Sequence, residues 1–141
     1  MDDIRINGHL GEIRFGAMLD RASALELFER TIETPRFMAC SVYLWDFTGC
    51  DVVLDTVEMK ALAERYSEMI PTPRRRCKIA LVADAPATRS RLMIMRSLLG
   101  RSERAEYRLF DRVSAARLWL AVRPHWTGNF PTMVESTPGS R

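Results

Sequence analysis

The chain has 141 residues, of which 47% are hydrophobic and 28% charged, and its formal net charge is +3. This length suits one domain with one core, and this composition excludes a disordered or fibrous protein. Only two of the 21 basic residues are lysines, and so modest an excess of positive charge does not indicate nucleic-acid binding. We therefore predict a single globular domain over residues 1–123 that does not bind nucleic acid.

The start of the chain and its cysteines bear on location and redox chemistry. The first ten residues are acidic where a secretory signal would be basic, and no apolar run reaches the roughly 18 residues that a membrane span needs. We expect a cytoplasmic protein with no membrane span. Cys40, Cys50 and Cys77 lack the spacing of a zinc site or of a disulfide framework, which predicts buried free thiols.

The N-terminal segment predicts a hairpin followed by a helix. Residues 4–15 alternate apolar and polar side chains on either side of Asn7-Gly8, which favours a tight turn between antiparallel strands. The helix is expected from Asp20, with Ser23 and Glu26 in capping-box spacing. Pro35 is its expected end. Its predicted buried face consists of Ala24, Leu25, Phe28 and Ile32.

Two continuous apolar runs, residues 41–47 and 77–84, predict neighbouring strands that are buried on both faces. A helix is expected between them, because apolar residues recur there at helical spacing until Pro71 and Pro73. The recurring residues are Met59, Leu62, Ala63, Tyr66, Met69 and Ile70.

The C-terminal part predicts a helix from Pro86 to Leu99, a strand over 105–110 and a short helix capped by Asp111. Alternating strands and helices indicate an α/β fold, a mixed sheet of about five strands with about four flanking helices, whose first strand is antiparallel. Residues 124–141 have the composition of an irregular tail. Its Trp126 and Phe130 are suited to docking on the domain or on a second copy, which leaves a homodimer open.

Little in the sequence indicates catalysis. His9 and His125 are the only histidines, one beside the hairpin turn and one in the tail, so neither a metal site nor a histidine-based acid–base pair is expected. Glycine-rich phosphate loops and the nucleophile elbow are both missing from the sequence. We predict a protein that is not an enzyme and that needs no cofactor.

A basic cluster precedes the strand at 77–84. Arg74, Arg75 and Arg76 would suit a phosphate, an anionic lipid head group or an acidic partner. Three arginines and Lys78 are also typical of a solvated loop, which is the interpretation we favour over an anion contact.

The stretch "WDFTGCDVVLDTVEM", residues 45–59, begins like a buried strand and ends like the first turn of a helix. Asp55 and Glu58 have capping-box spacing, which predicts that Asp55 accepts a backbone bond while Glu58 reaches back. Asp46 lies near the carboxyl end of the strand, where α/β proteins place their sites.

The longer segment "LWDFTGCDVVLDTVEMKAL" resembles the signature of STAS domains, the sulfate transporter and anti-sigma factor antagonist fold. That signature is a strand ending in Asp, a small turn, an apolar stretch, and Asp followed by Ser or Thr at a helix start. Asp46, Gly49, Val53, Asp55 and Thr56 fall on those positions. In STAS regulators the residue after the second Asp is phosphorylated, so the resemblance implies Thr56 as phosphoacceptor. The Ser-Gly that usually follows is Val57-Glu58 here.

Over residues 4–121 the chain is similar to the SpoIIAA-like branch, also described as STAS/SEC14 domains. The similar segments are "YLWDFTGCD", "KIALVAD" and "EYRLFDRVSAARLWL". This resemblance implies the fold more than a function, and its SEC14 side implies lipid binding for some members. The likeness to STAS regulators is what implies a regulatory role, in a bacterial protein.

We therefore expect a regulatory module that binds a protein partner and is switched at Thr56. The predicted partner surface consists of Asp46, Thr48, Gly49, Asp51, Asp55 and Glu58. The alternative is a binder of a lipid or small apolar ligand, because methionine adapts to irregular ligands. Its pocket would be lined by Met59, Met69, Met93 and Met95, which would otherwise be ordinary core residues.

Overall fold

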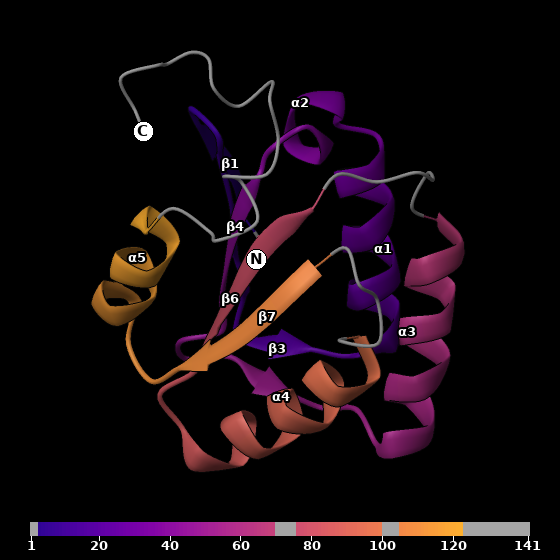
Figure 1. Cartoon of the computed structure of the whole chain (residues 1–141). Coiled ribbons are helices and arrows are strands. Elements are labelled where there is room, and N and C mark those ends of the chain that lie inside the picture. The colour runs from indigo at the N-terminus through magenta and orange to yellow at the C-terminus, as the bar shows by residue number, and fades with distance from the viewer. Residues whose placement is uncertain (1–2, 70–75, 100–104, 123–141) are drawn as a thin grey trace, which may run out of the picture.

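The computed structural model describes residues 3–69, 76–99 and 105–122, and the predicted tail at 124–141 lies outside this part (Figure 1). The strands are β1 (Asp3–Asn7), β2 (Leu10–Arg14), β3 (Met18–Leu19), β4 (Val42–Asp46), β5 (Asp51–Val52), β6 (Cys77–Val82) and β7 (Ala105–Phe110). The helices are α1 (Arg21–Ile32), α2 (Pro35–Met38), α3 (Thr56–Met69), α4 (Pro86–Leu99) and α5 (Val113–Ala121).

The main sheet has five strands in the order β1-β2-β4-β6-β7. β1 and β2 are antiparallel around Gly8, whose φ of 65° suits the tight turn, and every other neighbouring pair is parallel. β4 is central, between β2 and β6, and Tyr43, Leu44 and Trp45 are buried. The predicted α/β class, with a mixed five-stranded sheet and an antiparallel first strand, is confirmed.

The two faces of the sheet are covered unequally (Figure 1). Helices α1 to α4 lie on one face, above a large core that includes Trp45, Ile79 and Leu81. Of the described helices, α5 alone lies on the other face, above a smaller core built on Leu44 and Val82. The alternation of side chains along β4 and β6 places neighbouring residues in different cores, as the continuous apolar runs predict.

Polar contacts hold α5 in place. Lys78 Nζ donates hydrogen bonds to the carbonyl oxygens of Trp119 and Val122, both at 2.7 Å, and lies 4.6 Å from the centre of the Trp119 ring. A cation at these last carbonyls also meets the negative end of the helix. Burial lowers the pKa of Lys78. Farther along the helix, Arg117 donates to both carboxylate oxygens of Glu12 in β2 at 3.1 Å.

A small second sheet, formed by β3 and β5, was not predicted. It is parallel, and the backbone N–H of Val53 continues its ladder by donating to the Leu19 carbonyl at 2.8 Å. Two-residue strands are too short to give a periodic pattern, so the sequence signal was absent. This sheet fixes the course of the chain between β4 and α3.

Two predicted details of helix termini were wrong. The capping box of α1 joins Asp20 and Ser23 and not Ser23 and Glu26, because the helix begins at Arg21. The backbone and side-chain bonds from Ser23 lower the pKa of Asp20. As predicted, α1 ends before Pro35, at Ile32, and the proline itself lies in the first turn of α2, where its missing N–H costs no helical hydrogen bond.

The second wrong detail concerns α5, whose N-cap is Arg112 and not Asp111, with no side-chain cap bond. The buried face of α1 is also shifted from the predicted one, to Ala24, Leu27 and Thr31. Leu25, Phe28 and Ile32 are only half-buried. For α3, the predicted burial of Met59, Leu62, Ala63 and Tyr66 is confirmed. The three cysteines are buried free thiols, as predicted.

Candidate functional site

The predicted partner segment begins with a turn at the carboxyl end of β4. Asp46 accepts hydrogen bonds from the Thr48 backbone N–H at 3.0 Å and from the Thr48 hydroxyl at 2.6 Å. Gly49 has a φ of 76° and donates its N–H to Asp84 Oδ1 at 3.3 Å, just beyond β6. The carboxylates of Asp46 and Asp84 therefore shape this turn, which suits Gly because of its positive φ.

The segment ends in the predicted capping box. Glu58 donates its backbone N–H to Asp55 Oδ1 at 2.7 Å, and Asp55 donates its own N–H to Glu58 Oε1 at 3.0 Å. These reciprocal bonds satisfy two donors at the start of α3 and contribute about 1 kcal/mol. Capping accounts for both acids without any partner.

Exposed apolar side chains lie in the chain segment that contains this cap and on β3. Val57, in the first turn of α3, is 77% exposed, Met18 in β3 is 54% exposed, and Val53 is 47% exposed. Met18 pairs with Asp51, so alternation places the side chains of Met18, Asp51 and Val53 on the outer face of the small sheet. Thr56 is exposed in the same stretch of chain. We call Met18, Asp51, Val53, Thr56 and Val57 the junction surface.

The structure thus divides the predicted partner residues into two groups. Asp46, Thr48 and Gly49 belong to the turn after β4, whereas Asp55 and Glu58 cap α3. Among the described residues no hydrogen bond is seen between the groups, and β5 lies between them in the chain. No site was predicted at Met18, Val53 or Val57, although two valines in a segment of caps and turns are a weak signal of an exposed apolar surface.

The arginine cluster is described only in part. Arg74 and Arg75 lie outside the described residues, and Arg76 is exposed immediately before β6. The structure therefore adds no anion site to the prediction for these residues.

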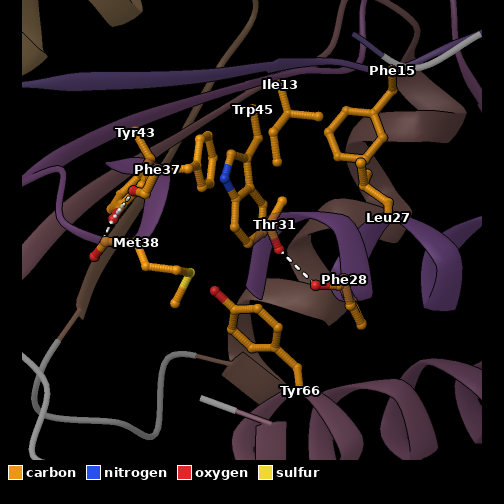
Figure 2. Close-up of a pocket in the computed structure, with 10 residues that line it drawn as sticks. All are labelled: Ile13, Phe15, Leu27, Phe28, Thr31, Phe37, Met38, Tyr43, Trp45 and Tyr66. Carbon is orange, nitrogen blue, oxygen red and sulfur yellow. Dashed lines mark hydrogen bonds between the residues drawn. The ribbon is translucent and has the colours of Figure 1, made fainter. Parts of the chain in front are cut away.

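An apolar pocket lies between the sheet and helices α1, α2 and α3 (Figure 2). Its lining is aromatic on the sheet side: Trp45 contacts Tyr66 edge-on with ring centroids 6.2 Å apart, and Phe37 lies 5.1 Å from Tyr43. The Tyr43 hydroxyl is within hydrogen-bond distance of three carbonyl oxygens, including that of Phe37 at 2.8 Å. Gly11 leaves room for these rings, since a Cβ there would lie 2.8 Å from Phe37.

Of the four methionines predicted to line a pocket, two lie at a hollow in the described structure. Met59 and Met95 line an adjoining hollow with Leu62 and Tyr66. Met93 is 58% exposed on the outer side of α4, so its predicted place in a pocket was wrong. The side chain of Met69 lies outside what the structure describes. Met59 is fully buried, as a core residue would be.

The described residues include no metal-binding cluster and no membrane-spanning helix. In residues 3–69, 76–99 and 105–122, no cluster of three or more His, Cys, Asp or Glu side chains could hold a metal ion. The described helices include none that is both long and apolar enough to cross a membrane. No protein-family model matches this chain, and no curated protein matches it. The likeness to STAS domains therefore rests on the residues quoted above.

Proposed function

We propose that this chain is a STAS-like regulatory module that binds a protein partner through the junction surface. The observation that carries the proposal is the exposure of Met18, Val53 and Val57, of which the two valines flank Thr56 in the chain. Exposed apolar side chains that gather at one place are typical of contact surfaces, because covering them with a partner removes apolar area from water.

The surroundings of this surface suit recognition. Its apolar side chains lie on a hydrogen-bonded sheet and on the first turn of a capped helix, so their positions are fixed before binding. A preformed surface loses little conformational entropy when a partner docks. Asp51 and Asp55 supply a polar rim of negative charge at the edge of the apolar side chains.

Thr56 is the proposed switch within this surface. It is exposed at the first position of α3, next to Asp55 and two residues before Glu58. A phosphate there would meet the positive end of the helix but also two carboxylates that already occupy backbone N–H groups. We propose that the added charge changes partner binding at Val53 and Val57 and leaves the fold intact.

A pair of matched variants tests the surface. Val57→Asp and Leu118→Asp each place a carboxylate at an exposed apolar position of a helix, Leu118 being 72% exposed on α5 on the opposite side of the sheet. In pull-downs at equal melting temperature, we expect Val57→Asp to lose a partner that Leu118→Asp retains. Identical partner sets for the two variants would contradict the proposal.

A second comparison tests the switch. Thr56→Glu mimics part of the phosphate charge, and Thr56→Ala removes the hydroxyl. We expect the glutamate variant to lose the partner that the alanine variant keeps. If both variants bind the partner equally, Thr56 is only a residue of the first helical turn.

A further inference from the structure

The last strand of the main sheet, β7, has a long outer edge. β7 pairs with β6 on one side, and no described strand pairs with it on the other side (Figure 1). The Phe110 carbonyl accepts the N–H of Ala83 at 3.1 Å, so the peptide groups of Phe110 point toward β6. Because the direction of the peptide groups alternates along a strand, those of Leu109 and Ala105 point away from β6. An edge of this kind can pair with a strand of another chain.

Two side chains of opposite charge lie on one face of this edge strand. Glu106 and Arg108 are both exposed and, being two residues apart, project from the face that α5 covers. Neither forms an ion pair with another described residue. The strand at the other edge of the sheet, β1, differs, because its Arg5 is paired with Asp3 of the same strand at 2.8 Å. Charges at a sheet edge usually hinder pairing, so their sign pattern decides what β7 can bind.

The sign pattern of β7 is self-complementary in one antiparallel register. If two β7 strands pair with the two-fold axis at Glu106, this residue faces its own copy, and with the axis at Arg108 the two arginines face each other. With the axis at Tyr107, each Glu106 faces Arg108 of the second copy. Opposite charges at facing positions stabilise a strand pair, whereas like charges destabilise it. The charges therefore favour the register centred on Tyr107.

The backbone fits the same register. It sets Ala105 opposite Leu109 of the second copy, so the outward peptide groups of these two residues meet as a hydrogen-bonded pair. Glu106 and Arg108 then form a non-hydrogen-bonded pair, in which the side chains approach each other more closely. On the opposite face of the strand, Leu109 is half-buried and lies beside the small side chain of Ala105 in this arrangement, which covers it further.

We propose that this chain forms a homodimer in which two β7 strands pair antiparallel about Tyr107, with Glu106 and Arg108 in reciprocal ion pairs. The same patch is used on both copies, so the interface is closed and the assembly stops at the dimer. One pair of six-residue strands buries less area than the roughly 1,200–2,000 Å² of a stable interface, so the dimer dissociates on dilution. This interface goes beyond the proposed function, since it uses no residue of the junction surface.

Sedimentation equilibrium of the full chain, over a wide range of protein concentrations at low salt, tests this interface. Glu106→Arg and Arg108→Glu each place like charges opposite one another in both contacts, so each variant should associate at least about tenfold more weakly than the wild type. In an equimolar mixture of the two variants, each strand carries one sign and faces the opposite sign. We expect the mixture to recover the wild-type association, which a misfolded variant would not do.

Arg5→Glu is the matched control, because it reverses an exposed charge on β1, at the other edge of the sheet. It should leave the dissociation constant unchanged. The proposal is overturned by a wild-type chain that stays monomeric at the highest concentration, by a mixture that fails to recover, or by an Arg5→Glu variant that associates as weakly as Glu106→Arg. Because the junction surface and β7 share no residue, these outcomes leave the proposed function to its own tests.

Discussion

The two faces of the sheet are stabilised in different ways. The face under α1 to α4 has a large aromatic and aliphatic core, with Trp45 in contact with Tyr66 and Tyr107. The face under α5 has a small core, and the helix is anchored by the buried Lys78 and the exposed pair of Arg117 and Glu12. The first face depends on packed area, whereas the second depends on a few directional contacts.

The largest expected effect comes from placing a charge in either core. Leu81 and Leu44 are both buried, one on each face, and an unpaired carboxylate at either position should cost more than about 5 kcal/mol. We expect neither Leu81→Asp nor Leu44→Asp to give soluble folded protein, with Leu118→Asp as the folded control. A cooperative thermal transition for Leu44→Asp would mean that α5 can detach while the rest stays folded.

The next largest effect tests packing on the face of the sheet under α1 to α4. In Gly11→Ala the added methyl group would lie 2.8 Å from Phe37 and 2.9 Å from Tyr43, and overpacking of this kind costs about 1–3 kcal/mol. Gly8→Ala meets no neighbouring atom but adopts a positive φ, at about 1 kcal/mol. Urea unfolding of both variants would separate the two costs. Equal losses would show that the rings near Gly11 adjust freely.

A third change tests the anchor of α5. Lys78→Met keeps an aliphatic side chain and removes two charge-assisted hydrogen bonds, which destabilises the fold. It also removes the cost of burying a charge, so we expect a net loss of unfolding free energy of about 1–2 kcal/mol. Folding lowers the pKa of Lys78. In the alkaline range below the ordinary pKa of lysine, the unfolded chain therefore binds more protons than the folded protein does. Wild-type stability should therefore rise relative to Lys78→Met in that alkaline window. A constant difference across this window would contradict the lowered pKa.

The smallest effect compares the two residues at the start of α3. Asp55→Ala removes the acceptor of the Glu58 N–H and should cost about 1 kcal/mol, whereas Thr56→Ala removes no hydrogen bond of the cap and should change stability little. Thermal melting of the two variants decides between them. A larger loss of stability for Thr56→Ala than for Asp55→Ala would contradict the assignment of Asp55 as the cap.

The sequence predicted the features that depend on local patterns. Continuous apolar runs located β4 and β6, Asn7-Gly8 located the hairpin, and the spacing of Asp55 and Glu58 located a cap. Pro86 also marked the start of α4. These signals were sufficient because each is local and has one common structural solution.

The remaining features depend on tertiary contacts. The strands of the small β3–β5 sheet are too short to show a periodic pattern of apolar residues. At the start of α1, Asp20 and Ser23 are both suitable caps, and the sequence alone does not decide between them. No sequence pattern could show that Trp45 Nε1 lacks an acceptor among the described residues, since that depends on which carbonyl oxygens approach it. A tryptophan in the middle of a buried strand was nonetheless a signal, because it brings a donor into an apolar core.

The position of β4 between two parallel partners has a consequence for how the chain folds. β4 pairs with β2 and with β6, and these three segments are far apart in the sequence, from Leu10–Arg14 to Cys77–Val82. The hairpin of β1 and β2 can form early during synthesis, but β4 keeps an unpaired edge until β6 has been made. A nascent chain that stops before Cys77 therefore exposes a strand rich in apolar residues to other chains. We expect such a truncated chain to aggregate or to depend on chaperones, which expression of residues 1–75 would reveal.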